Sequence, residues 1–212
     1  YAKCAAQIAC DMKINDLDLK STQTNLIAVK KPVFPFNKFP KQKVFLSPEM
    51  RSTGEVIGFD TQLGSAYAKA EMAAGHKLPL EGVCFVSVNN ADKSKIIKIV
   101  RDLLEMNFQV IATKGTSTLL NQNGIKATTI YKVGEGRPNI VDEIKNKQIS
   151  IIINTPLGAQ SRYDEYKIGN AAIKYKIPVI TTISGAQAAV RAIRILKNNN
   201  LNYVSLQEIF NR

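Results

Sequence analysis

The sequence contains 212 residues, of which 45% are hydrophobic and 22% charged, a balance that allows a buried core and excludes a chain disordered by composition. Its 29 lysines and arginines exceed its 17 aspartates and glutamates, which gives a net charge of +12. No apolar run approaches the roughly 20 residues that a membrane-spanning helix requires, so we expect no membrane insertion. The length suits one large domain, or one domain with a substantial attachment.

Cysteine and histidine content limits the kinds of site that the chain can hold. The three cysteines, Cys4, Cys10 and Cys84, have no CxxC spacing, which argues against a disulfide scaffold or a zinc site and favours a reducing cytoplasm. His76 is the single histidine, so a site that needs two histidines is excluded. The sequence begins at Tyr1 with neither an initiator methionine nor a signal-peptide pattern, from which we expect a fragment of a longer chain.

The positive charge is concentrated in the C-terminal part. Residues 1–75 hold 10 basic and 7 acidic side chains, whereas residues 76–212 hold 19 and 10, so the surpluses are +3 and +9. Such a surplus predicts an anionic partner: a phosphate-bearing metabolite, a nucleic acid or another protein. Aromatic residues make up only 7%, and no block of like charges occurs, which disfavours a nucleic-acid surface. A solvated lysine-rich surface without a partner stays open.

The first 75 residues show little alternation of strands and helices. The predicted elements are a helix at 1–12, a strand at 25–30, an extended proline-rich segment at 32–40 and a helix at 61–74. We expect this helix to end at Gly75 and a linker to follow at 76–81. About 60 residues of this kind cannot form a convincing core alone, so we interpret 1–75 as the tail of a preceding domain.

From residue 82 onward, short apolar strands alternate with helices. The predicted strands are 82–88, 108–112, 127–130, 149–154 and 179–181, and the predicted helices are 92–106, 116–122, 139–145, 163–175, 186–196 and 204–210. This alternation indicates an α/β fold, a Rossmann-like five-stranded parallel sheet with helices on both faces. Right-handed crossovers would bring the carboxyl ends of all strands to one edge.

The turns after these strands hold the candidate binding residues, because ligands of open parallel sheets bind at the carboxyl ends. In the second turn, Gly115 would allow a tight bend, and Thr116 or Ser117 would cap a helix whose free N–H groups suit a phosphate. Lys93 and Lys132, after the first and third strands, would add positive charge. A hydroxyl-rich helix cap without a ligand, and lysines that merely face solvent, remain the alternatives.

Other polar residues near this edge have less specific signals. Asn154 ends the most apolar strand, where its amide needs a partner, either a backbone group or the base or ribose of a nucleotide. Asp92 and Asp164 are expected to cap helices or to pair with lysines, and Arg137-Pro138 predicts a helix start. Neither GxGxxG nor GxxxxGK[ST] is present, which argues against a dinucleotide or NTP-hydrolysis site. The sequence therefore indicates a site that binds an anion without transforming it.

Two segments carry a family resemblance. The strings VFPFNKFP at 33–40 and PEMRSTGEV at 48–56 closely resemble the end of the second ATP-grasp half of the carbamoyl-phosphate synthase large chain. Residues 82–212 resemble the C-terminal allosteric domain of that chain, which has the methylglyoxal-synthase-like fold. The resemblance covers essentially the whole sequence and implies that it is the C-terminal part of a protein of about a thousand residues, with a remnant of an ATP-grasp domain before the allosteric domain.

The resemblance implies a role in a larger enzyme. Members of the family make carbamoyl phosphate for pyrimidines and arginine from glutamine-derived ammonia, bicarbonate and two ATP, with Mg or Mn. They work with a glutaminase small chain, and the allosteric domain contributes to homo-oligomers. Because the catalytic ATP-grasp residues would lie upstream, we expect this stretch to be catalytically inactive and to hold no cofactor of its own.

The resemblance also implies a site for UMP or IMP at the allosteric domain. The nucleotide-binding positions that carry over are Lys93, Thr113, Gly115, Thr116 and Lys132 for the phosphate, with Asn154 and Thr182 facing the nucleoside. Two departures occur: Pro156 stands where the family often has a threonine, and Val179 stands where ornithine-responsive members have a tyrosine. Thr181 matches the family threonine on the possible ornithine side.

Three other functions fit the same fold. A methylglyoxal synthase would need a histidine in its pocket, and the single His76 lies in the predicted linker. An IMP cyclohydrolase-like enzyme shares the first strand and the Gly-Arg-Pro turn but would not carry the ATP-grasp strings. A protein-interaction domain that uses this edge for protein contact is compatible with the sequence.

Overall fold

The computed structural model describes residues 2–17, 25–33, 54–155, 159–198, 201–205 and 207–208. Residues 34–40, most of the 48–56 string and Pro156 lie outside the described residues. Within the described part, no helix has the length and apolar character needed to cross a bilayer.

A parallel sheet of five strands forms the centre of the C-terminal part, as predicted. Its strands are β3 (Gly82–Val88), β4 (Phe108–Thr113), β5 (Thr128–Ile130), β6 (Ile151–Thr155) and β7 (Val179–Ile180). Their order across the sheet is β5-β4-β3-β6-β7, and every neighbouring pair is parallel. All carboxyl ends therefore meet at one edge.

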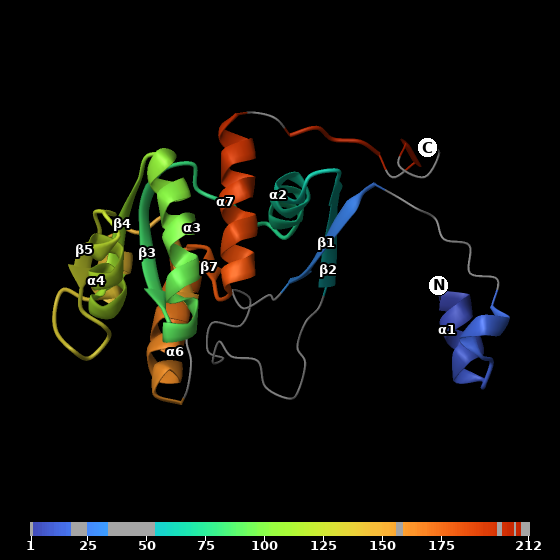
Figure 1. Cartoon of the computed structure of the whole chain (residues 1–212), viewed down its shortest axis with the longest axis horizontal. Coiled ribbons are helices and arrows are strands. Elements are labelled where there is room, and N and C mark those ends of the chain that lie inside the picture. Colours follow the sequence, from blue (N-terminus) through green and yellow to red (C-terminus); the bar gives the residue numbers. More distant parts are fainter. Residues whose placement is uncertain are drawn as a thin grey trace.

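Helices cover both faces of this sheet. They are η3 (Asn90–Asp92), α3 (Lys93–Glu105), α4 (Lys114–Gln122), α5 (Ile140–Lys145), α6 (Ala159–Lys174) and α7 (Ile183–Lys197). One apolar cluster joins α3, α4 and α7 to one face, and another joins α5 and α6 to the opposite face. Figure 1 shows α3 and α7 in front of the sheet and α6 behind it.

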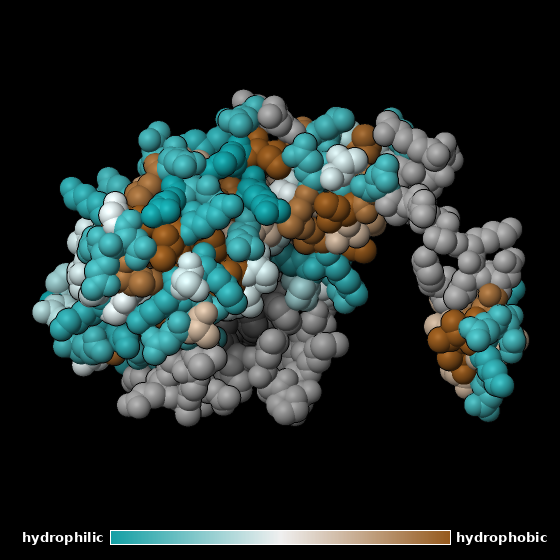
Figure 2. Space-filling view, in the orientation of Figure 1, coloured by the Kyte–Doolittle hydropathy of each residue, from teal (hydrophilic) through white to brown (hydrophobic). Residues whose placement is uncertain are grey.

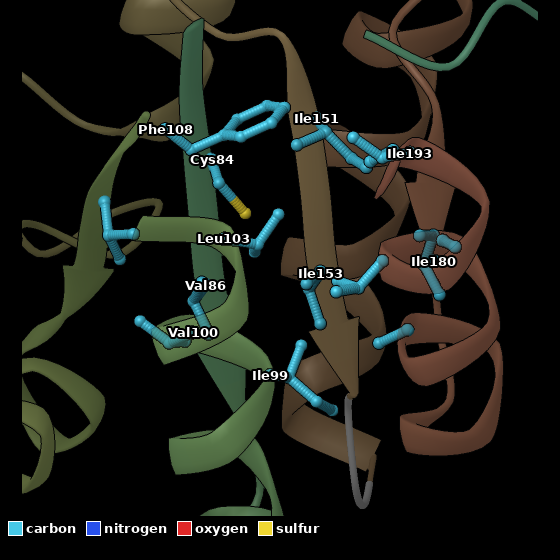
Figure 3. Packing of buried hydrophobic residues seen from close by; sticks show 14 of the residues in the cluster. Cys84, Val86, Ile99, Val100, Leu103, Phe108, Ile151, Ile153, Ile180 and Ile193 are labelled. Carbon is cyan, nitrogen blue, oxygen red and sulfur yellow. The ribbon is translucent and has the colours of Figure 1, made fainter. Parts of the chain in front are cut away.

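The alternation of side chains along the strands explains the two clusters. Cys84 and Val86 of β3 face α3 and α7, whereas Phe85 between them faces α5 and α6, and all three are 0% exposed. Figure 3 shows Leu103 of α3 and Ile193 of α7 packed over this first face. Burial raises the pKa of the Cys84 thiol, which is therefore a core residue and no nucleophile.

One helix boundary differs from the prediction in a way that affects the site. Strand β4 continues to Thr113, and α4 begins directly after it at Lys114, two residues earlier than predicted. Thr116 and Ser117 therefore lie inside α4 instead of capping it, and the predicted caps are wrong. Thr113 occupies the N-cap position without a side-chain capping bond.

The starts of two further helices were also misplaced. The side chain of Asn139 caps α5 by accepting a hydrogen bond from the Val141 N–H at 3.0 Å, so Pro138 precedes this helix and is not in its first turn. In the region predicted as helix 204–210, Ser205 is not helical and its hydroxyl accepts a bond from the Glu208 N–H at 3.2 Å. A capping side chain decides both boundaries.

The N-terminal part contributes a second, smaller sheet. Its elements are α1 (Ala2–Ala9), η1 (Ile14–Asp16), β1 (Ile27–Val33), β2 (Gly54–Asp60) and α2 (Leu63–Ala73). β1 and β2 pair as an antiparallel ribbon, and β2 was not predicted. The predicted helix before Gly75 is confirmed, and Gly75 follows it with φ +76°. Figure 1 shows α2 between α7 and the β1–β2 ribbon.

Candidate functional site

Three polar side chains form a row across the carboxyl ends of the central strands. Ser87 of β3 lies in register with Asn154 of β6, and the Thr113 hydroxyl donates a hydrogen bond to Ser87 Oγ at 3.3 Å. Phe85 and Ile152, two residues before Ser87 and Asn154, pack in the cluster beneath α5 and α6. Side chains two apart on a strand share a face, so this polar row of Ser87, Thr113 and Asn154 lies on the α5–α6 face.

Asn154 is the member of the polar row that is left for a ligand. Its side chain forms no hydrogen bond with another described residue, although Asn154 is only 7% exposed. Thr113, by comparison, is 5% exposed and uses its hydroxyl on Ser87. Because an amide both donates and accepts hydrogen bonds, Asn154 suits a ligand with hydroxyl or amide groups.

Lys93 and Gly115, two of the residues predicted for a phosphate seat, lie close together near the end of β4. Lys93 opens α3 and Gly115 lies in the first turn of α4. Lys93 Nζ lies 3.6 Å from the point that a Cβ on Gly115 would occupy. Gly115 has helical backbone, so its role is this close approach and not a tight bend. The first N–H groups of α4 have no partner within the helix, and Thr113 supplies no side-chain cap for them.

The two hydroxyls that follow Gly115 hold the scaffold together. Thr116 is 1% exposed, and its hydroxyl accepts a hydrogen bond from the Val88 N–H at 3.3 Å, which ties α4 to the end of β3. Ser117 is also 1% exposed, and its hydroxyl lies 2.8 Å from that of Thr129 on β5. Thr116 is therefore placed beneath the candidate phosphate seat and not at its surface.

Lys132 lies after β5, at the outer end of the same edge, beside acidic groups. Its backbone N–H donates to the Glu135 carboxylate at 3.3 Å. Burial raises the pKa of Asp164 above its ordinary value, the charge of Lys132 opposes this, and Glu135 adds to it. Asp164 therefore lies within range of the Lys132 charge, but burial prevails over this attraction.

A cavity of about 520 Å³ opens beyond Lys132, between α5, α6 and the turn that follows β5. Its lining is basic, with three cations and one carboxylate, and consists of Val133, Gly134, Gly136, Arg137, Asn139, Val141, Asp142, Lys145 and Lys167. An anion or an anionic ligand is favoured there over a cation.

A cavity of about 440 Å³ lies at the other end of the edge, where β3, β6 and β7 finish. It is mainly polar, and its lining consists of Asn89, Asp92, Lys95, Thr155, Thr181, Thr182, Ile183, Ser184 and Gln187. Thr182 caps α7 by accepting a hydrogen bond from the Gly185 N–H at 3.1 Å. Asp92 accepts a bond from Asn89 Nδ2 at 2.7 Å and does not cap α3, contrary to the prediction.

The predicted site residues thus fall into two groups at one edge. Neighbouring strands lie about 4.8 Å apart, so the ends of β5 and β7, which have three strands and therefore four spacings between them, are about 19 Å apart. A mononucleotide that contacts both Lys132 and Thr182 would have to extend across most of this edge. The structure brings Lys93 close to Gly115, places Thr113 and Asn154 on the two strands that flank β3, and leaves Thr181 and Thr182 with the smaller cavity.

Sequence reasoning missed two residues that shape this edge. Ser87 completes the polar row, and Asn89 links the end of β3 to β6 through a bond from its Nδ2 to the Thr155 carbonyl at 3.2 Å. Ser87 sits inside an apolar strand, where the step-two alternation with Phe85 was the available signal. Within the described ranges, no cluster of three or more His, Cys, Asp or Glu residues could hold a metal ion.

Comparison with known proteins agrees with this fold. Residues 95–181 match the family model described as MGS-like domain. The chain is 45% identical, over 98% of its length, to the carbamoyl phosphate synthase large chain of Nostoc sp., and 47% identical, also over 98%, to that of Archaeoglobus fulgidus. It is 47% identical, over 87% of its length, to the large chain, C-terminal section, of Methanopyrus kandleri.

The chain spans only part of these relatives, namely 19% of the first two and 34% of the third. Its matches to proteins described as C-terminal sections come from both Methanopyrus kandleri and Aquifex aeolicus. By sequence and by fold, the chain therefore belongs with the C-terminal part of the carbamoyl phosphate synthase large chain and contains an MGS-like domain.

Proposed function

We propose that this chain is the regulatory C-terminal region of a glutamine-hydrolysing carbamoyl phosphate synthase, and that UMP or IMP binds at the edge of its parallel sheet. Binding would control the synthesis of carbamoyl phosphate for pyrimidines and arginine. The observation that carries the proposal is the approach of Lys93 to Gly115 at the start of α4, on the same edge of the sheet as the buried Asn154.

A phosphate group suits the space beside Lys93. The free N–H groups and the positive end of the α4 dipole favour an anion, and Lys93 adds a full charge close to Gly115. Lys132 at the end of β5 would supply a second cation. Thr113 and Thr116 contribute through their positions, since their hydroxyls already bond to Ser87 and to the Val88 N–H.

The nucleoside would extend from this phosphate toward the α5–α6 face. Asn154 lies on that face and offers its amide to a ribose or a base. The basic cavity near Lys132 lies on the same side. Thr181 and Thr182 belong to the opposite cavity, so we assign them no contact with the nucleotide and keep Thr181 as the position to examine for ornithine.

The remainder of the proposal concerns the whole enzyme. Catalytic sites that use ATP and Mg or Mn would lie in the preceding part of the large chain, leaving this stretch without synthase activity. Its partners would be the rest of the large chain, the glutaminase small chain and further copies in a cytoplasmic homo-oligomer. Within the stretch, residues 1–75 would complete the ATP-grasp domain, 76–81 would link, and 82–212 would bind the effector.

A thermal-shift titration with UMP, IMP, ornithine and dihydroxyacetone phosphate tests the nucleotide site. A ligand that binds only the folded chain stabilises it by about 2.7 kcal/mol at a hundred times its Kd. We expect UMP or IMP to raise the melting temperature and Lys132→Ala to remove most of that rise. Lys126→Ala is the matched control, because Lys126 is exposed and precedes β5, at the opposite edge of the sheet.

Two results would contradict this assignment. Saturable UMP binding that survives Lys93→Ala and Lys132→Ala places the nucleotide elsewhere. Conversion of dihydroxyacetone phosphate would indicate an enzyme of the methylglyoxal synthase kind. The position of the single histidine opposes that outcome, because His76 Nδ1 lies 3.1 Å from the Glu71 carboxylate, next to α2 and away from the sheet edge.

A further inference from the structure

The turn that follows β5 lines one side of the basic cavity and is held by its own contacts. Tyr131 pairs with Asn139 in a parallel bridge, and Asn139 Nδ2 donates a hydrogen bond to the Gly136 carbonyl at 3.2 Å. A Cβ on Gly136 would lie 3.0 Å from the Tyr131 ring, so the turn packs directly on that ring. The cavity of about 520 Å³ is therefore formed by the chain itself, before a ligand enters, as is common for sites of small molecules.

Part of the cavity wall is apolar. Val133 and Val141 line the cavity, and Val133 also packs against the buried cluster beneath α5 and α6. Gly134 and Gly136 add no side chains to the lining, and nothing lies within 4 Å of the position that a Cβ on Gly134 would occupy. A flat heterocyclic ring suits a wall of this kind, because its faces need apolar contacts and little height.

The cavity holds more positive charge than the neutral bases of UMP and IMP require. Arg137, Lys145 and Lys167 line it together with one carboxylate, Asp142. This carboxylate already accepts a hydrogen bond from the Asn139 N–H at 3.1 Å and lies 4.0 Å from Arg137 Nε. Among the described residues, Lys145 has no hydrogen-bond or ion-pair partner, so its ammonium is left for a ligand.

The other acidic groups nearby lie toward Lys132. Glu135 accepts a hydrogen bond from the Lys132 N–H at 3.3 Å. Burial raises the pKa of Asp164 against the charges of Lys132 and Lys167, so Asp164 lies within range of both lysines. Neither Glu135 nor Asp164 lines the cavity, whose three cations and one carboxylate leave it with a charge of +2.

We propose that the nucleotide bound at this edge carries a carboxylate on its base, and that Arg137, Lys145 and Lys167 hold this carboxylate. The inference rests on the proposed function, because it takes the phosphate to lie beside Lys93, and it adds the class of base. The apolar wall and the cations line one cavity, so the ring and the charge belong to the same part of the ligand. Lysine and arginine bind a carboxylate through charge-assisted hydrogen bonds, which a neutral base cannot form.

Two pairs of nucleotides that differ only in carboxylates test this inference by calorimetry on the 212-residue chain. Orotidine 5′-monophosphate is UMP with a carboxylate on the ring, and adenylosuccinate is AMP with two carboxylates on its exocyclic nitrogen. We expect at least one carboxylated nucleotide to bind about fivefold more tightly than its parent, the gain of one favourable ion pair at a solvent-exposed site. In about 0.5 M salt this advantage should shrink, because salt screens such pairs.

Two variants identify the cations that supply the advantage. Lys145→Gln and Lys167→Gln should each at least halve the ratio of the two Kd values within a pair, and should change the Kd of the parent nucleotide by less than about twofold. Lys126→Gln is the matched control, because it removes the same charge from an exposed residue at the opposite edge of the sheet and should retain the full ratio. Since each ratio compares two ligands on one variant, a uniform loss of folded protein does not change it.

The outcomes separate this inference from the nucleotide site itself. Equal binding of both members of each pair to the wild type overturns the carboxylate assignment and leaves the nucleotide site standing. The same holds if Lys126→Gln reduces the ratio as much as the two cavity variants do. Absence of binding by IMP and by all four paired nucleotides overturns both proposals.

Discussion

The sheet domain and the N-terminal part are stabilised by different forces. Around the parallel sheet, aliphatic residues of β3, β6, α3 and α7 are fully buried, whereas α1 and β1 contain no buried residue. Figure 2 shows apolar surface over α2 and the β1–β2 ribbon, where Ile57 and Met72 are 50% and 48% exposed. The N-terminal elements bury mainly the small residues of α2, and ion pairs connect Lys31 to Glu71 and Lys69 to Asp60.

The two parts also differ in how the pKa values of their carboxyl groups are shifted. Burial alone would raise the pKa of Glu71, but hydrogen bonds from His76 and Lys31 and the charge of Lys31 outweigh it and lower the pKa. Asp60 behaves in the same way through Lys69. Asp164 of the sheet domain has a raised pKa, because burial prevails there. Ionisation therefore stabilises the N-terminal part and opposes folding at Asp164.

The largest expected effect is on the hydrophobic side of this comparison. Ile152→Ala removes a 0% exposed side chain from the central strand β6 and should lower the free energy of unfolding by about 2–5 kcal/mol. Ile57→Ala, the same truncation on the ribbon, should change it by no more than about 0.5 kcal/mol. Urea unfolding of both variants measures the contrast, and equal losses would show that the ribbon belongs to the core.

The next effect concerns the buried carboxylate of the N-terminal part. Glu71→Gln should cost about 2 kcal/mol at pH 7, because Glu71 accepts a bond from the Lys31 ammonium and one from His76 while almost fully buried. Its lowered pKa means that this contribution is complete above the ordinary value of 4.5 and is lost as the pH falls through the folded-state pKa. The difference between variant and wild type should therefore shrink between pH 5 and pH 3, measured as unfolding free energy in urea.

An exposed glutamate provides the control for that experiment. Glu55→Gln removes the same charge from a pair with Lys30 at 2.8 Å, but both side chains are mostly exposed, so we expect a loss between about 0 and 1 kcal/mol. A Glu55 effect as large as that of Glu71 would mean that net charge, and not the buried network, stabilises this part.

The smallest expected effect has the opposite sign. Asp164→Asn should raise the unfolding free energy at pH 7, by less than about 0.5 kcal/mol since the carboxylate is only half-buried and screened by solvent. Because the folded-state pKa is raised, the penalty removed by this change is absent below the unfolded-state pKa and grows as the pH rises through the folded value. Thermal unfolding at pH 3 and pH 7 should show a gain only at pH 7, and a loss at pH 7 would place Asp164 in a stabilising ion pair.

Local patterns were sufficient to predict most of the sheet domain and insufficient for the ribbon. Strand β3 was predicted with its observed bounds, since its apolar run begins after Gly82 and stops before the polar Asn89. Strand β2 contains Gly54 and Gly58, which weaken a strand signal, and it is a strand because it pairs with β1 and packs on α2. Such long-range pairing has no local signature.

The candidate site likewise contains residues that the local sequence predicted and residues whose environment it did not predict. Lys93 and Gly115 were identified from their places after strands, and the structure brings them together. Thr116 or Ser117 was predicted as the cap of this helix, yet Thr116 lies inside α4 and is buried, because β4 runs on to Thr113 and α4 starts early. One residue of displacement at a strand end changes which hydroxyls face a ligand.

The amino-acid sequence by itself determined the alternation of apolar strands and helices, because burial on both faces of a parallel sheet demands that pattern. It also determined which edge carries the polar turns, since crossover handedness is general. The tertiary structure alone decided the strand order β5-β4-β3-β6-β7, which separates Lys132 from Thr182, and the backbone contact of Gly64 with α7. Both depend on distances between residues far apart in the chain, which no local pattern encodes.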